Sequence, residues 1–147
     1  MTQGVEARPG VTGRRSFLLV MLASGHGITH WYQQGFWAIF PTIKEQMGMT
    51  AVQAGMLVTA RQIVGGLVNL PAGALADLLA KYRAFILATS IVWLGLSYFL
   101  VGVSPNFIVL LIAVGLTGAG GTIWHAPALS TLSQRFPDRR GFALSTH

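Results

Sequence analysis

The chain has 147 residues, of which 52% are hydrophobic and 10% charged; it contains no cysteine, and its formal net charge is +6. This composition is typical of an integral membrane protein, and it leaves almost nothing for a soluble domain. The lack of cysteine excludes disulfides and thiolate metal sites. A basic chain can also bind nucleic acid, so the positions of its basic residues have to be considered.

Four runs are long and apolar enough to cross a bilayer, whose core of about 30 Å needs about 20 helical residues. We place these helices at residues 16–40, 52–76, 84–103 and 107–132, after an N-terminal tail at 1–15, and we expect a fifth helix to begin at 141–147. The start of the first run resembles a cleavable export signal, but apolar residues resume after Gly27 and make it too long for one. The sequence therefore predicts an all-α integral membrane protein with about four transmembrane helices.

The basic residues follow the connections between these helices. With a cytoplasmic N-terminus, the cytoplasmic set is Arg8, Arg14, Arg15, Lys81, Arg83, Arg135, Arg139 and Arg140. Only Lys44 lies in an outside loop, and Arg61 lies within the second helix. This is the positive-inside pattern of a multi-span protein. We therefore interpret the charge as an orientation signal and expect no nucleic-acid partner.

The first helix carries a polar stripe. His26, His30, Gln33 and Trp37 are spaced by four, three and four residues, so they share one helical face, and Gln34 lies beside them. Unsatisfied polar groups cost several kcal/mol each in hydrocarbon, so this face looks into protein or a water-filled cavity. We favour a cavity wall over a packing seam. Histidine also binds and releases protons near physiological pH, as proton-coupled transport requires.

Arg61 lies about ten residues into the second helix, about 15 Å deep. A central arginine costs about 2.5–3.5 kcal/mol on insertion scales. The four acidic residues, Glu6, Glu45, Asp77 and Asp138, all lie near helix ends or in tails. A bound anionic substrate is one explanation for Arg61; helix-terminal carbonyls or a water-filled cavity is the other.

The fourth helix combines glycines with Trp124, His125 and Pro127. We expect the glycines to let helices approach closely and Pro127 to kink the helix. These glycines are Gly115, Gly118, Gly120 and Gly121, with Gly65 and Gly66 in the second helix.

The connection "GALADLLAKYR" resembles the signature loop of the major facilitator superfamily. Gly73, Asp77 and Arg83 match its glycine, acidic and basic positions, whereas Leu78, Ala80 and Tyr82 depart from its usual residues. The glycine-rich "GLTGAGGTIWHAP" and the following "RFPDRRGFALS" also resemble that family. The resemblance implies that the chain is part of the N-terminal half of a twelve-helix carrier. It also implies that a set of residues at the cytoplasmic ends controls gating: Gly73, Asp77, Arg83, Pro127, Arg139, Arg140 and Gly141.

Two histidines, each followed by a proline further along the same helix, make the resemblance more specific to one branch of the superfamily. His26 precedes Pro41 by fifteen residues, and His125 is followed by Ala126 and Pro127. This arrangement resembles the fosmidomycin-resistance branch of efflux carriers, in which the second pair is adjacent.

The predicted function is proton-coupled efflux of a small molecule across the cell membrane, the inner membrane if the source is bacterial. Candidate substrate and proton-pathway residues are His26, His30, Gln33, Gln34, Trp37, Arg61, Trp124 and His125. The chain ends at His147, so we expect the remaining helices to come from missing sequence or a second chain. No nucleophile–base–acid set or phosphate loop is visible, and we expect no catalytic residue, cofactor or metal. The alternative is a four-helix membrane protein that binds haem or a metal through His26, His30 and His125.

Overall fold

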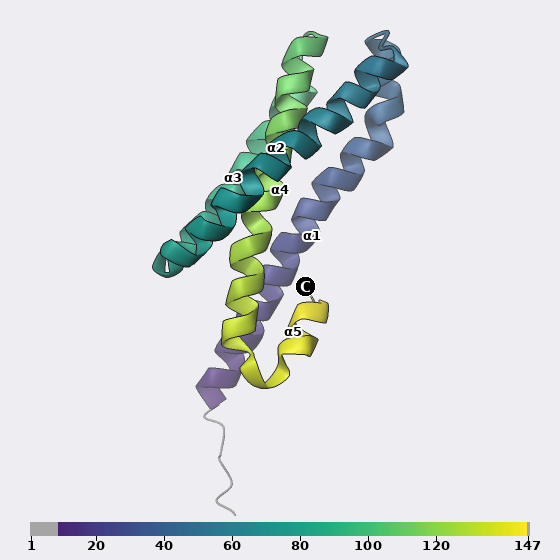
Figure 1. The fold of residues 1–147 in the computed structure, drawn as a ribbon. Coiled ribbons are helices and arrows are strands. Elements are labelled where there is room, and N and C mark those ends of the chain that lie inside the picture. Colours follow the sequence, from purple (N-terminus) through teal and green to yellow (C-terminus); the bar gives the residue numbers. More distant parts are fainter. Residues whose placement is uncertain (1–8, 147) are drawn as a thin grey trace, which may run out of the picture.

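The computed structural model describes residues 9–146, with side chains described from residue 13 onward. Five α-helices make up almost all of this part, and it contains no strand (Figure 1). They are α1 (Pro9–Gln46), α2 (Ala51–Leu78), α3 (Arg83–Gly102), α4 (Phe107–Arg135) and α5 (Arg140–Thr146). Short 3-10 turns at Ala80–Tyr82 and Pro137–Arg139 precede α3 and α5. The predicted all-α fold class is confirmed.

Local sequence explains where α2 and α4 begin. Thr50 and Gln53 form a capping box: the Gln53 amide donates to the Thr50 hydroxyl at 3.2 Å, and the Thr50 amide donates to the Gln53 side chain at 2.9 Å. The Asn106 side chain accepts from the Val109 amide at 3.1 Å at the start of α4. Between α1 and α2, Gly48 turns the chain with a φ of 59°, a conformation that favours glycine.

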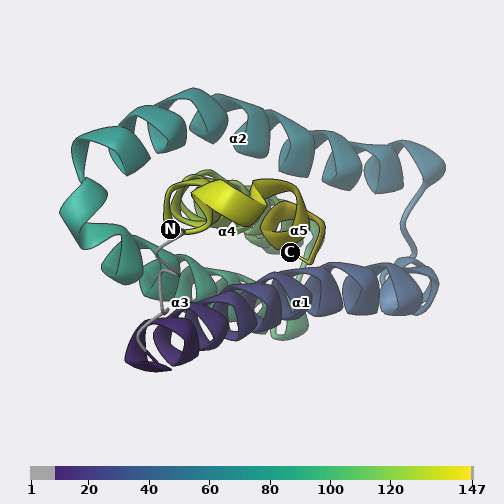
Figure 2. The ribbon, with the colours of Figure 1, turned by 90° about the horizontal axis from the view of Figure 1, so that it is seen from below.

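Helix α4 lies at the centre of the bundle. Seen along the bundle, α2 runs on one side of α4, and α1 and α3 run on the other (Figure 2). Helix α4 packs extensively against α2 and α3 and only lightly against α1. Helix α1 therefore lies along α4 but makes few contacts with it.

Three helical segments are long and apolar enough to cross a membrane: Ala51–Leu78, Ala80–Gly102 and Phe107–Arg135. Their outward faces carry large exposed apolar side chains such as Leu70 and Phe85, as expected for contact with lipid. The prediction of about four spans is thus confirmed for three. Helix α1 has the length, but the polar residues between His26 and Gln34 lower its hydropathy.

The first helix is also longer than the predicted span of 16–40. It begins at Pro9 and continues through Pro41 to Gln46. The prediction followed the apolar residues, whereas the helix continues until Gly48 turns the backbone.

Glycines set the closest contacts between helices. A Cβ on Gly118 would overlap the backbone carbonyl oxygen of Arg61, and the Thr122 hydroxyl donates to the Gly65 carbonyl at 3.3 Å. Gly115 and Gly120 also lie close to neighbouring helices, whereas Gly66 and Gly121 have nothing within 4 Å of their Cβ positions. The expected close-packing role therefore applies to four of the six glycines named above.

Two apolar clusters hold the helix ends together. The cluster near the α1–α2 turn includes Phe36, Leu57 and Leu110. The other lies where α5 folds back and includes Leu22 and Leu132. The polar residues of α1, at positions 26 to 33, lie between these two apolar layers.

Candidate functional site

A cavity of about 500 Å³ lies between α1, α2 and α4. Much of its lining is polar, although it lies within helices that are otherwise apolar. Its lining residues are Gln33, Trp37, Val58, Arg61, Gln62, Gly65, Gly66, Asn69, Gly118, Gly121, Thr122 and His125. A polar cavity of this size is within the range of small-molecule sites.

Helix α2 contributes one continuous face to this cavity. Arg61, Gln62, Gly65 and Asn69 recur at helical spacing, so their Cα atoms follow the same side of α2. Of the residues on α2, the sequence alone pointed only to Arg61 as a substrate-site residue. Gln62 and Asn69 were detectable by the same argument, because they are amides within an apolar span and share the face of Arg61.

Arg61 lies half-buried in the cavity wall. Its guanidinium forms no ion pair or hydrogen bond with any side chain of residues 13–146. Arg61 therefore faces a cavity, which is compatible with both a bound anionic substrate and a water-filled space. Its backbone carbonyl abuts Gly118, so the helix crossing fixes the position from which the side chain extends.

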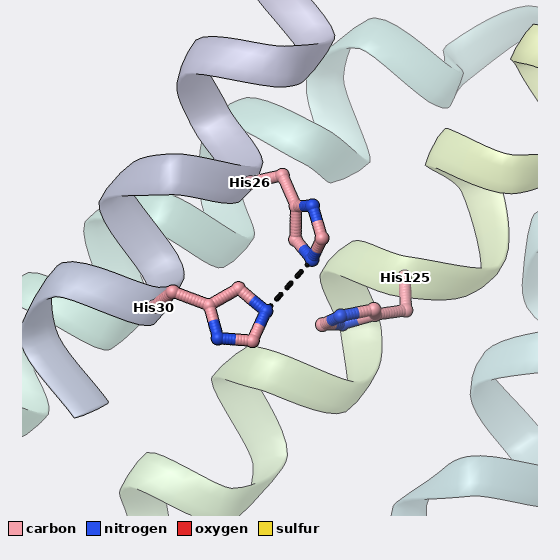
Figure 3. Close-up of side chains that lie close together, drawn as sticks. All are labelled: His26, His30 and His125. Carbon is pink, nitrogen blue, oxygen red and sulfur yellow. Dashed lines mark hydrogen bonds between the residues drawn. The ribbon is translucent and has the colours of Figure 1, made fainter. Parts of the chain in front are cut away.

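Three histidines from two helices converge beside the cavity (Figure 3). The Nε2 atoms of His26 and His30 on α1 lie 2.8 Å apart, within hydrogen-bond distance. His125 on α4 faces both, with its ring centroid 5.2 Å from that of His26 and 6.4 Å from that of His30. One ligand nitrogen from each ring lies within 4.8 Å of the others. The fold thus brings together residues about one hundred positions apart.

The tautomer of His125 follows from its backbone contact. Its Nδ1 lies 2.6 Å from the Gly121 carbonyl oxygen. A carbonyl can only accept, so Nδ1 carries the proton and donates. In the neutral ring the lone pair then lies on Nε2.

The other candidates on α1 and α4 lie in different surroundings. Gln33 and Trp37 line the cavity, whereas Gln34 is exposed and is not part of the lining. Trp124 is buried, and its ring fills the space beside Gly25 on α1. Its indole nitrogen has no hydrogen-bond partner within the described part of the chain. In this structure Trp124 therefore packs α4 against α1 and does not line the cavity.

The residues assigned to gating lie near the α5 end of the bundle. Arg83 donates from Nη1 to the Gln134 side chain at 2.6 Å and from Nε to the Ala76 carbonyl at 3.4 Å, which links the ends of α2 and α4. Pro127 is buried within α4. Gly73 and Gly141 have open space at their Cβ positions, and the remaining three are exposed: Asp77, Arg139 and Arg140.

Comparison with protein families matches residues 22–147 to the Major Facilitator Superfamily. The chain belongs to this superfamily. No curated protein and no solved structure matches it. Members of the superfamily are membrane transporters of small molecules, so this assignment accounts for the apolar helices and the polar cavity together. It gives no support to the alternative of a haem or metal protein in place of a carrier.

Proposed function

We propose that this chain forms the first helices of a proton-coupled carrier that exports a small molecule, similar to the fosmidomycin-resistance branch. The observation that supports this proposal most directly is the polar cavity between α1, α2 and α4. Its polar side chains require water or a cargo, because hydrocarbon would leave them unsatisfied.

Cargo binding is assigned to the cavity wall. Arg61 supplies a planar fork of donors that suits a carboxylate or phosphate-like group. Gln33 and Asn69, together with Gln62, supply amides that donate and accept. Trp37 offers an aromatic face for apolar parts of the cargo. Carriers of this architecture bind their cargo near the bilayer midplane, between structural repeats.

Proton coupling is assigned to the histidine pair on α1. Two Nε2 atoms 2.8 Å apart share one hydrogen, since one ring donates to the other. A second proton would place two donors face to face and break this contact. Because His125 lies beside the pair and lines the cavity, such a change would alter the position of a side chain at the cargo site.

Gating is assigned to the end of the bundle that carries Arg83. The bonds from Arg83 to Gln134 and Ala76 hold α2 and α4 together there. We assign this end to the cytoplasm, together with the N-terminus, on the distribution of basic residues. Separation of these helix ends would open the cavity to that side, with Asp77 and Arg139 at the opening.

Single-cysteine labelling tests the cavity, and the natural chain needs no cysteine removed. Gln33→Cys and Asn69→Cys, reconstituted in lipid vesicles, should react with a water-soluble maleimide. Matched controls on the same helices are Ile28→Cys and Leu67→Cys, which occupy exposed apolar positions. Reaction of the cavity positions at the control rate would show a dry seam and remove the cargo site.

Transport itself is tested in cells that lack their main efflux systems. Expression of the chain, alone and joined to the later helices of another carrier of the same superfamily, should lower accumulation of at least one anionic compound in a panel. A protonophore should abolish the effect, and His26→Gln should reduce it while membrane insertion stays normal. If accumulation of every compound is unchanged in both forms, proton-coupled efflux is wrong.

A further inference from the structure

We propose that His26, His30 and His125 together form a binding site for a divalent late first-row transition metal ion, represented here by Zn²⁺. This is a site inside a member of the carrier family, not the haem or metal protein considered above as an alternative to a carrier. It goes beyond the proposed function, because an ion can bind here whatever the cargo is. The sequence alone favoured a carrier without a metal, because the loop motifs have no purpose in a haem or metal protein and no carboxylate is visible beside the histidines.

The distances between the ligand atoms are close to those that a metal ion requires. Zinc binds imidazole nitrogen at about 2.0–2.1 Å with tetrahedral geometry, so three ligand nitrogens lie about 3.3 Å from one another. The Nε2 atoms of His26 and His30 are 2.8 Å apart, and all three ligand nitrogens lie within 4.8 Å of each other. The His26–His30 separation is slightly shorter than this value, and the widest of the three separations, at most 4.8 Å, would have to shorten when an ion binds.

The His125 ring already has the tautomer of a metal ligand. Its Nδ1 donates to the Gly121 carbonyl at 2.6 Å, so Nε2 carries the lone pair. Metal-bound histidines usually donate their other nitrogen to a carbonyl or carboxylate, which fixes the tautomer and makes the ligand more basic. Both residues of this contact belong to α4, so it does not depend on how α1 lies against α4.

The chemistry of the ligands selects the class of ion. Imidazole suits zinc, copper, nickel and cobalt, whereas magnesium and calcium need oxygen ligands. The acidic residues with described side chains, Glu45, Asp77 and Asp138, are near helix ends and are not part of the cluster. Three histidines and an open fourth position are a known arrangement for zinc. Because His125 also lines the cavity, the fourth ligand would be water or an anion from that side.

Metal binding has a mechanical consequence that can be measured. Two ligands come from α1 and the third from α4, and these helices otherwise pack only lightly together. An ion bound to all three would join α1 to α4 and stabilise the folded chain. Zinc should therefore raise the denaturant concentration at which the protein unfolds.

The test uses the full chain, purified in mild detergent without a histidine tag. Zn²⁺ is titrated against a chromophoric chelator, and Co²⁺ absorption reports tetrahedral coordination without any variant. We expect one ion per chain and a cobalt spectrum of tetrahedral type. His30→Ala and His125→Ala should each weaken zinc binding by about 100-fold or more, since even loss of outer-shell partners costs 10–100-fold. His147→Ala is the matched control and should bind zinc normally.

Three results would each overturn the site. The natural chain would bind zinc no more tightly than a variant that lacks all three histidines, or its cobalt spectrum would be of octahedral type. In the third, His147→Ala would weaken zinc binding as much as His30→Ala or His125→Ala. Far-UV circular dichroism of each variant separates a lost ligand from a lost fold. Zinc binding without efflux would support the metal site and contradict the carrier proposal. Efflux without zinc binding would support the carrier proposal and contradict the metal site.

Discussion

Replacing Gly118 with alanine should destabilise the contact between α2 and α4, because the added Cβ would overlap the Arg61 carbonyl oxygen. The same Cβ would lie 3.1 Å from the Gly65 amide nitrogen. Both obstacles are backbone atoms of α2 that cannot rotate away, so the two helices must move apart. Overpacking of this kind costs about 1–3 kcal/mol.

Two smaller effects adjust this value. Separation of the helices would break the 3.3 Å bond from Thr122 to the Gly65 carbonyl, at a cost of about 0.6 kcal/mol for a hydrogen bond between membrane helices. Alanine recovers about 0.8–1 kcal/mol of helix propensity relative to glycine. The net destabilisation is then about 2 kcal/mol, roughly a 30-fold change in the unfolding equilibrium constant.

Gly121→Ala is the matched control, because it lies one turn further along α4 and has nothing within 4 Å of its Cβ position. It gains the same propensity without the overlap and should be stabilised slightly. Unfolding of both variants in mixed micelles, followed by circular dichroism, measures the difference. Equal unfolding midpoints for the two variants would refute the close approach of α2 and α4 at Gly118.

Three further predictions concern function and topology. Arg61→Lys should impair transport more than membrane insertion, because a point charge replaces a bidentate fork, and unchanged transport kinetics would remove Arg61 from the cargo site. Arg83→Ala should lower the free energy of unfolding by about 1 kcal/mol through loss of its bond to Gln134, and chemical denaturation tests this value. Cysteines placed at Lys44 and Asn106 should react with an impermeant maleimide added outside intact cells; reaction only after the inner face is exposed would reverse the proposed orientation.

Sequence patterns predicted the order of the helices and several of the residues that line the cavity. Arg61 and Gln33 stood out because polar residues in apolar helices need an unusual environment, and both line the cavity. The helical spacing of His26 and His30 also predicted that they share a face, and their Nε2 atoms are within hydrogen-bond distance. These conclusions depend only on short-range periodicity within one helix.

Relations between helices were harder to predict. Trp124 lies next to His125 in sequence, yet it points into the contact with Gly25 while His125 lines the cavity. Adjacent residues on a helix face directions about 100° apart, so proximity in sequence does not give a shared role. The approach of His125 to the α1 pair likewise depends on how α1 and α4 cross, which no single segment encodes.

Gly66 and Gly121 place bare backbone on two sides of the cavity, since nothing occupies the space beyond their Cα atoms. A cargo would meet peptide groups and empty volume there, not side chains. Alanine, serine or valine at either position would reduce the volume of the cavity without changing its charged and amide side chains. On the proposed assignment of the cargo site, single substitutions at these two glycines would change the range of compounds that the carrier accepts and leave the Arg61 side chain in place.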